Sequence, residues 1–186
     1  MDPSVSDIEL VNKCIKGNHE AFSELVTRYK KLVFKVVFNI INNEQEVNDV
    51  SQEVFLKVYK NLKAYNPEYK FSTWIIKIAT NHCLDIVRKK KIDSVSIDDA
   101  INVSDKRDTP EESFIRKEKV EKIREAISEL PEKYRIPIIL FHKNGLSYEE
   151  MTNVMNEPIT IIKNRLYRAR LMLKDKLVPE RKEGAL

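Results

Sequence analysis

The chain has 186 residues and a formal net charge of +4, and only 3 Gly and 7 Pro interrupt it. Apolar residues make up 42% and charged residues 33% of the sequence, a balance that suits amphipathic helices and disfavours strand-dense folds. Because no apolar run is long enough to cross a bilayer and no leader-like segment opens the chain, we expect a cytoplasmic protein without membrane insertion.

Charge is distributed unevenly along the sequence. Residues 1–91 carry 15 basic and 11 acidic side chains, residues 92–112 carry 2 and 7, and residues 113–186 carry 16 and 11. Two basic blocks therefore flank an acidic connector. Basic domains favour a polyanionic partner such as nucleic acid, which an acidic connector would avoid.

Capping signals open the predicted helices of the first basic block. Ser6 and Glu9 form a capping box for the first helix, which Gly17 closes. Asn18 can cap a second helix, whose apolar stripe extends to Ile40. The 3.6-residue period predicts that each helix buries one face.

A third helix is predicted from Glu44 to Leu62, with a buried stripe of four valines, Val47, Val50, Val54 and Val58. On the opposite side, Leu56 lies among the polar residues Asp49, Gln52, Glu53 and Lys60. An isolated exposed Leu is ordinary on a protein surface, but an apolar anchor ringed by polar groups also resembles an interface hot spot. The residues alone leave both interpretations open.

Aromatic and polar side chains gather in the loop from Lys63 to Phe71 and in the fourth helix, which we expect Ser72 to cap. The aromatic members are Tyr65, Tyr69, Phe71 and Trp74, and one polar face of the helix carries Lys77, Asn81, Asp85 and Arg88. Aromatic rings beside cationic and amide groups can hold unstacked bases of a single strand. The alternative is that Phe71 and Trp74 are core residues, as we expect for Trp74 at least.

Residues 92–109 have no helical period and are rich in Asp and Ser, which predicts a flexible acidic linker. Thr109 and Pro110 then signal the start of a new helix. A further helix is predicted from Glu132 to Lys143, and Pro137 inside it should remove one hydrogen bond or bend it.

The strongest local signal is a helix-turn-helix between Ser147 and Leu177. Ser147 opens a short helix, Asn156 can adopt the left-handed turn conformation, and the last helix starts near Ile159. The apolar stripe of the last helix comprises Ile162, Leu166, Ala169 and Leu173. Its opposite face is basic and polar and carries Thr160, Lys163, Asn164, Tyr167 and Arg168.

Such a face can lie in the major groove of duplex DNA, where Asn and Arg read base edges and Lys and Arg hold phosphates. A solvated basic face on an ordinary amphipathic helix is the alternative. The capped helix and the turn before it favour DNA binding.

Signals of an enzyme are missing from the sequence. It contains no Gly-rich phosphate loop, nucleophile elbow or paired-histidine zinc motif, so we expect no catalytic residue, cofactor or metal. Cys14 and Cys83 are far apart in apolar stretches, and we interpret both as core residues. His82, within an apolar helix, is expected to be packed.

In this order and spacing, the motifs resemble those of bacterial sigma factors of the extracytoplasmic-function (ECF) group. The first block resembles region 2 of that family in DVSQEVFL, from Asp49 to Leu56, and in FSTWI, from Phe71 to Ile75. The second block resembles region 4 in GLSYEE, from Gly145 to Glu150, and in KNRLYRAR, from Lys163 to Arg170. The chain departs from the family at Ile161, where a Thr is usual and could contact a phosphate.

The resemblance implies an all-α protein of two small helical domains, residues 1–91 and 110–186, joined by the flexible acidic linker of residues 92–109. It implies that RNA polymerase core is bound by Asp49, Gln52, Glu53 and Leu56. It implies that the minus-ten strand of the promoter is bound by Tyr65, Tyr69, Lys70, Phe71, Ser72, Lys77, Asn81 and Arg88. The minus-thirty-five duplex would be bound by Thr160, Lys163, Asn164, Tyr167 and Arg168, and the acidic linker would thread the RNA exit path of the polymerase.

The expected protein is thus a sigma factor, not an enzyme, that binds RNA polymerase core and directs promoter recognition, promoter melting and transcription initiation under the control of an anti-sigma factor. The main alternative is a stand-alone helix-turn-helix regulator, which would need only the second domain. A metal-dependent nuclease is a weaker alternative, because no ligand motif is present.

Overall fold

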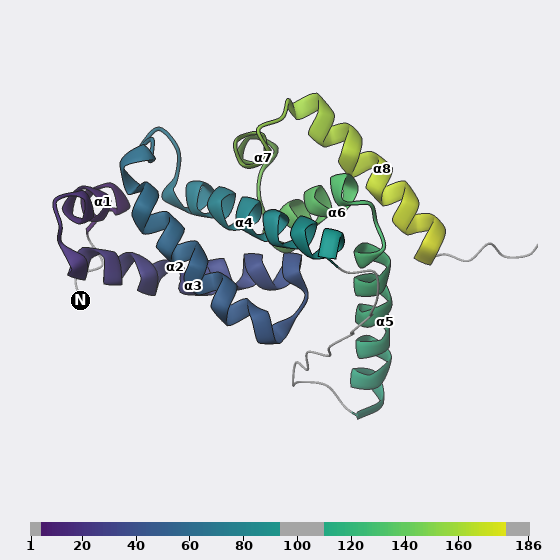
Figure 1. Ribbon diagram of the computed structural model, residues 1–186. Helices are drawn as coiled ribbons and strands as arrows, with labels where there is room; N and C mark the ends of the chain where they lie inside the picture. The colour runs from purple at the N-terminus through teal and green to yellow at the C-terminus, as the bar shows by residue number, and fades with distance from the viewer. Residues whose placement is uncertain (1–4, 94–109, 178–186) are drawn as a thin grey trace, which may run out of the picture. The chain divides into compact units, whose positions relative to one another are not determined.

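The computed structural model describes residues 5–93 and 110–177, with only the backbone described for residues 91–93, 110–117 and 119. Within these ranges the regular elements are all helical (Figure 1). The chain divides into two compact units, and the main division falls between residues 99 and 100, inside the predicted linker. Most of that linker, together with the predicted cap Thr109, lies outside the described residues.

The first unit is built around one long amphipathic helix. This helix, α2 (His19–Ile41), packs against α1 (Asp7–Ile15), α3 (Glu44–Asn61) and α4 (Phe71–Asp93). Its most deeply buried side chains follow the predicted stripe and include Leu25, Val33, Val36 and Val37. A short 3₁₀ turn (Leu62–Ala64) leads from α3 into the loop that precedes α4.

The predicted start of the first helix is confirmed. The backbone N–H of Glu9 donates to Ser6 Oγ over 3.2 Å, and the N–H of Ser6 donates to the Glu9 carboxylate over 3.0 Å. Gly17 follows the helix with a φ of +92°, a backbone conformation that glycine adopts without steric cost. Asn18 caps α2 as predicted, because its side chain accepts a hydrogen bond from Ala21 N–H over 2.9 Å.

The predicted cap of the fourth helix is wrong. Helix α4 begins at Phe71, one residue before Ser72, so Ser72 lies within its first turn. The carbonyl of Lys70 accepts the first hydrogen bonds of this end, from the N–H groups of Thr73 and Trp74 at 3.0 and 3.2 Å. A serine in the first helical turn gives the same local signal as a serine at the cap.

Four further helices follow in the second described range, residues 110–177. Helices α5 (Pro110–Ser128), α6 (Glu132–Ile138) and α8 (Ile159–Leu177) pack together, and α7 (Tyr148–Met155) precedes α8 across a short turn. Pro137 in α6 has no N–H to donate to the preceding turn. The helix predicted to reach Lys143 therefore changes type soon after this proline and continues as a π-helical segment (Ile139–Lys143).

Three chemically reactive side chains of the first unit are buried. Cys14 and Cys83 are free thiols in the core, as predicted, and burial raises the pKa of Cys83 to about 12. His82 is also packed, with 7% of its surface exposed. Across the described ranges, none of the helices combines the length and the hydropathy that a membrane crossing requires.

Two leucines of the first unit test this packing. Leu25 is 1% exposed, so Leu25→Ala would leave a cavity and should lower the free energy of unfolding of this unit by about 2–5 kcal/mol. Leu56 is 61% exposed, so Leu56→Ala should change it by less than about 0.5 kcal/mol. Urea denaturation followed by circular dichroism measures both effects. Equal destabilisation by the two substitutions would contradict the assigned core.

Candidate nucleic-acid interface

The orientation of α8 about its own axis is set by a fully buried apolar stripe. Ile162, Leu166 and Ala169 are each 0% exposed, while the fourth predicted member, Leu173, is half-buried. Because the helix repeats every 3.6 residues, this stripe turns the opposite face toward solvent. All five residues of the predicted duplex-binding set are exposed: Thr160, Lys163, Asn164, Tyr167 and Arg168.

A capping box and one left-handed residue define the start of α7 and the turn between α7 and α8. Ser147 and Glu150 form the predicted capping box, with hydrogen bonds of 3.0 and 3.2 Å. Asn156, in the turn before α8, has a φ of +53°, as expected for an amide residue in this position. Local residues, the Ser147–Glu150 capping box and Asn156, therefore fix where α7 starts and where the turn lies.

Aromatic rings hold two cations beside the exposed face of α8. The ammonium group of Lys163 lies 5.4 Å from the centre of the Tyr148 ring, which stacks on Phe141 at 5.1 Å. The guanidinium group of Arg170 lies 5.6 Å from the centre of the Phe141 ring. Cation–π attraction of this kind restricts where the charges can move.

Arg168 has a partner within the second unit that the sequence did not indicate. Its guanidinium group lies near the Tyr134 hydroxyl and is the largest cause of a lowered pKa of Tyr134, with Lys133 adding to the effect. Arg165, on the same helix, pairs instead with Glu157 at 2.8 Å. Arg168 is therefore exposed and has a half-buried tyrosine as its neighbour.

The outer face of α3 has the predicted composition. The valine stripe is buried, and all four residues of the predicted polymerase-binding set are exposed: Asp49, Gln52, Glu53 and Leu56. The sequence did not indicate that Glu53 accepts a hydrogen bond from the buried His82, with 2.7 Å between Oε2 and Nε2. Nor did it indicate an apolar recess of about 480 Å³ beside Gln52, lined in part by Phe34 and Phe55.

Seven of the eight residues predicted to bind the minus-ten strand are at least partly accessible. Tyr69, Lys70, Asn81 and Arg88 are exposed, and Tyr65, Ser72 and Lys77 are half-buried. A recess of about 400 Å³ is lined by the loop from Tyr65 to Ser72 together with the first residues of α1. The loop and the polar face of α4 are thus the candidate surfaces of the first unit.

Phe71 corrects the prediction, because its ring is only 2% exposed and cannot meet a base in this conformation. It packs against Tyr29, Tyr65 and Trp74, with ring centres 5.1, 5.3 and 5.4 Å away. Trp74, expected in the core, is half-buried. Of the two aromatic residues, Phe71 is therefore the more deeply buried.

Comparisons with known proteins place both units in one family. The model of Sigma-70 region 2 matches residues 25–92, and the model of Sigma-70 region 4 matches residues 120–173. The ECF RNA polymerase sigma factor SigW of Bacillus subtilis is 32% identical over 171 residues, which cover 87% of this chain and 91% of that protein. The ECF RNA polymerase sigma-E factor of Escherichia coli K12 is 31% identical over 188 residues, covering 96% of this chain and 98% of that protein.

Solved structures of the same fold agree with this placement. CnrH in complex with the cytosolic domain of CnrY has a TM-score of 0.67 at 23% identity, covering 92% of this chain and 96% of that chain. RpoE of Bartonella quintana, in complex with the anti-sigma factor NepR, has a TM-score of 0.68 at 20% identity, covering 86% of this chain and 98% of that chain.

Two all-helical units, one of which presents a helix-turn-helix with an exposed basic face, define a DNA-binding protein of the transcription machinery. The chain belongs to the ECF RNA polymerase sigma factors, a family of promoter-recognition subunits that are not enzymes. It binds RNA polymerase core and directs it to promoters. A stand-alone regulator is not favoured, because the region 2 unit is present and the relatives match over nearly their full length.

The proximity of Arg168 to Tyr134 can be tested by titrating Tyr134. Tyr134 should lose its proton at a lower pH than an ordinary tyrosine, because Arg168 and Lys133 stabilise the phenolate. Arg168→Ala should raise the pKa of Tyr134 toward its usual value, and Lys174→Ala, on the same helix, should not. NMR titration of the ¹³C-labelled tyrosine Cζ carbons measures this shift. A pKa of Tyr134 that is the same with and without Arg168 would rule out the contact.

Proposed function

We propose that this sigma factor has two domains, residues 1–91 and 110–186, which together carry three binding surfaces. The exposed face of α8 binds the minus-thirty-five duplex, the loop before α4 with the polar face of α4 binds the minus-ten strand, and the outer face of α3 binds polymerase core. The observation that carries the proposal is the exposure of all five α8 residues opposite a stripe that is 0% exposed.

The chemistry of the α8 face suits a major groove. Arginine can pair with guanine through two parallel hydrogen bonds, and asparagine can do the same with adenine. Arg168 and Asn164 are therefore the proposed base readers. Lys163 supplies charge at a position that its contact with Tyr148 restrains, so it is suited to a phosphate or a guanine edge. Thr160 and Tyr167 complete the face.

The loop before α4 suits an unpaired strand. Tyr69 offers an exposed ring, and Lys70 and Arg88 offer exposed cations. Stacking of one base on an aromatic side chain contributes about 1–3 kcal/mol, which can offset the few kcal/mol needed to take a base out of the duplex. Asn81 can hydrogen-bond a base edge, while the buried Phe71 supports the loop without contacting DNA.

Leu56 is proposed as the anchor of the polymerase interface. It is 61% exposed on α3 and is surrounded by Asp49, Gln52 and Glu53. Interfaces commonly draw most of their binding energy from a few apolar anchors that become desolvated, while polar neighbours exclude water around them.

The acidic segment of residues 92–109 is proposed to thread the RNA exit path of the polymerase, where its negative charge would stand in for the polyanion. Tethering the two domains makes the second promoter contact intramolecular once the first has formed. Specificity then requires both promoter elements at a compatible spacing.

We further propose that the protein acts in the cytoplasm under an anti-sigma factor. Of the two similar solved complexes, RpoE is bound to an anti-sigma factor, NepR, and CnrH to the cytosolic domain of CnrY. Several large apolar side chains are exposed, among them Leu56 in the first unit and Val120, Ile123 and Leu171 in the second. A protein inhibitor that covers such residues would keep the idle protein from making wrong contacts.

Leu56→Asp should lower the affinity for polymerase core about 30-fold or more, because a charge would have to be desolvated where an apolar anchor was buried. Ile15→Asp is the matched control, since Ile15 is also an exposed apolar residue of the first unit and lies outside α3. Its affinity for core should be unchanged. Fluorescence anisotropy with labelled protein and core polymerase measures both variants. Equal affinity of Leu56→Asp and the unsubstituted protein would refute the assignment.

Arg168→Ala should reduce the preference of the protein for its upstream element over random duplex DNA about tenfold, because a bidentate base contact is lost. Lys174→Ala removes the same charge from the last turn of the same helix. It should weaken binding to both duplexes alike and leave their ratio unchanged. Competition binding assays with the two duplexes measure the ratio. If Arg168→Ala leaves this ratio intact, Arg168 does not read the groove.

A further inference from the structure

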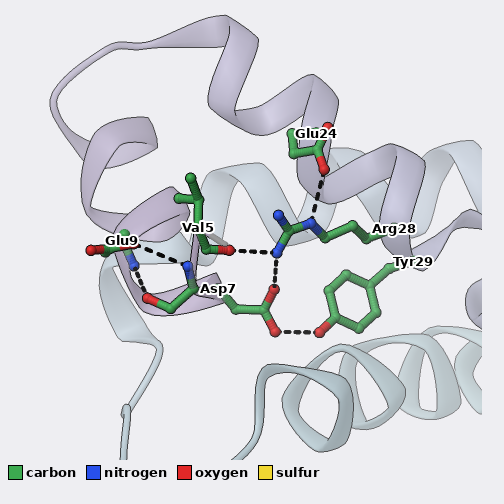
Figure 2. Close-up of polar contacts among 7 residues, drawn as sticks. Val5, Asp7, Glu9, Glu24, Arg28 and Tyr29 are labelled. Carbon is green, nitrogen blue, oxygen red and sulfur yellow. Dashed lines mark hydrogen bonds and ion pairs between the residues drawn. The ribbon is translucent and has the colours of Figure 1, made fainter. Parts of the chain in front are cut away.

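The first helix carries a carboxylate whose two oxygens both have partners on α2 (Figure 2). Asp7 Oδ1 accepts a hydrogen bond from Arg28 Nη1 over 3.3 Å, and Asp7 Oδ2 accepts one from the Tyr29 hydroxyl. The guanidinium group of Arg28 is itself fixed, because it donates to Glu24 over 2.9 Å and to the Val5 carbonyl over 2.8 Å. Asp7 lies outside the residues that the region 2 family model matches.

Asp7 is fixed from its own side as well. It is the first residue of α1, directly after Ser6, whose hydrogen bonds with Glu9 close the capping box (Figure 2). Helix α1 packs against α2 and against the 3₁₀ turn that leads into the loop before α4. The carboxylate thus has little freedom to move away from Tyr29.

Tyr29 connects this carboxylate to the loop proposed to bind the minus-ten strand. Its ring lies 5.1 Å from the ring of Phe71, and Phe71 lies 5.3 Å from Tyr65 in an edge-on contact at 83°. The Tyr65 hydroxyl donates to the carbonyl of Tyr69 over 2.7 Å, across the loop. Two ring contacts and one hydrogen bond therefore lead from Tyr29 to the most exposed aromatic residue of the loop.

We propose that Asp7 is a positioning residue for capture of the minus-ten strand: it holds Tyr29 against Phe71 and so fixes the loop before DNA arrives. A loop that is already ordered does not have to lose conformational freedom on binding, which leaves more of the interaction energy for affinity. The inference rests on the proposed role of the loop, and it adds a contribution from α1 to that role.

Because Asp7 is negatively charged, the direction in which its substitution changes DNA affinity distinguishes two explanations. Asp7 lines the recess formed with the loop, where an unpaired carboxylate would repel a DNA strand. Removing this charge should therefore strengthen binding if electrostatics alone mattered, whereas loss of positioning should weaken it. Burial and the hydrogen bond to Asp7 raise the pKa of Tyr29 well above its usual value, so Tyr29 remains a donor at any pH used for binding.

The experiment uses the full chain and a fluorescein-labelled single-stranded oligonucleotide. The oligonucleotide carries the minus-ten element of a promoter that the protein selects in run-off transcription with core polymerase. Asp7→Asn should weaken its binding about three- to tenfold, the range expected for the loss of one typical intramolecular hydrogen bond. Tyr29→Phe, which keeps the ring and removes the hydroxyl, should have a similar effect. The double variant should be no weaker than the single variants, because the same contact is lost.

Glu24→Gln is the matched control, because it removes one negative charge next to the same guanidinium group and leaves Tyr29 untouched. It should bind the oligonucleotide at least as well as the unsubstituted protein. All variants should bind polymerase core equally well through α3, which lies in the same unit, and unfolding of the first unit would not allow this. Should Asp7→Asn fail to fold, Tyr29→Phe carries the test.

Unchanged or tighter binding of the oligonucleotide by folded Asp7→Asn and Tyr29→Phe would overturn the inference. So would additive losses in the double variant. Tyr69→Ala and Lys70→Ala separate this failure from a failure of the proposed function. If these loop variants weaken binding and Asp7→Asn does not, only the role of Asp7 is wrong. If the loop variants bind normally, the assignment of the loop is wrong and this inference falls with it.

Discussion

The burial of Ile162, Leu166 and Ala169 is the constraint on which the account of α8 depends. These side chains are 0% exposed, and burying a large aliphatic side chain is worth about 1.5–3 kcal/mol. Turning the helix to hide Asn164 or Arg168 would expose the two larger members of the stripe, at a cost of about 3–6 kcal/mol. That is a large part of the stability of a small domain. Packing on one side of α8 thus keeps the opposite, basic face accessible to solvent.

The same principle acts in the first unit. The valines of α3 face the core, so Leu56 and its polar neighbours must face outward. In both units, the surfaces proposed to bind partners consist of the side chains left exposed after the helices have packed. A sigma factor whose helices are each buried along one stripe can therefore vary its outward side chains, and with them its promoter preference, with little effect on the fold.

Local signals in the sequence predicted many of the helix ends and turns. The bounds of α8, the capping boxes at Ser6 and Ser147, and the left-handed Asn156 were predictable because each depends on residues within one turn of helix. Contacts between distant residues were not predictable. Asp7 meets Tyr29, and Glu53 meets His82 29 residues away, but periodicity places a side chain on a face without naming its neighbour. Phe71 and Trp74 were misjudged for this reason, since their burial depends on Tyr29 and Tyr65.

The central claim is that one chain binds duplex DNA with α8 and unpaired DNA with its first unit while it is bound to polymerase. Run-off transcription with core polymerase, on promoters in which the distance between the two elements is varied, tests it most directly. The account predicts transcripts that require both protein and core, that start downstream of two shared elements, and that disappear when about 5 base pairs, half a helical turn, are inserted between them. Start sites that are insensitive to this insertion would contradict the account.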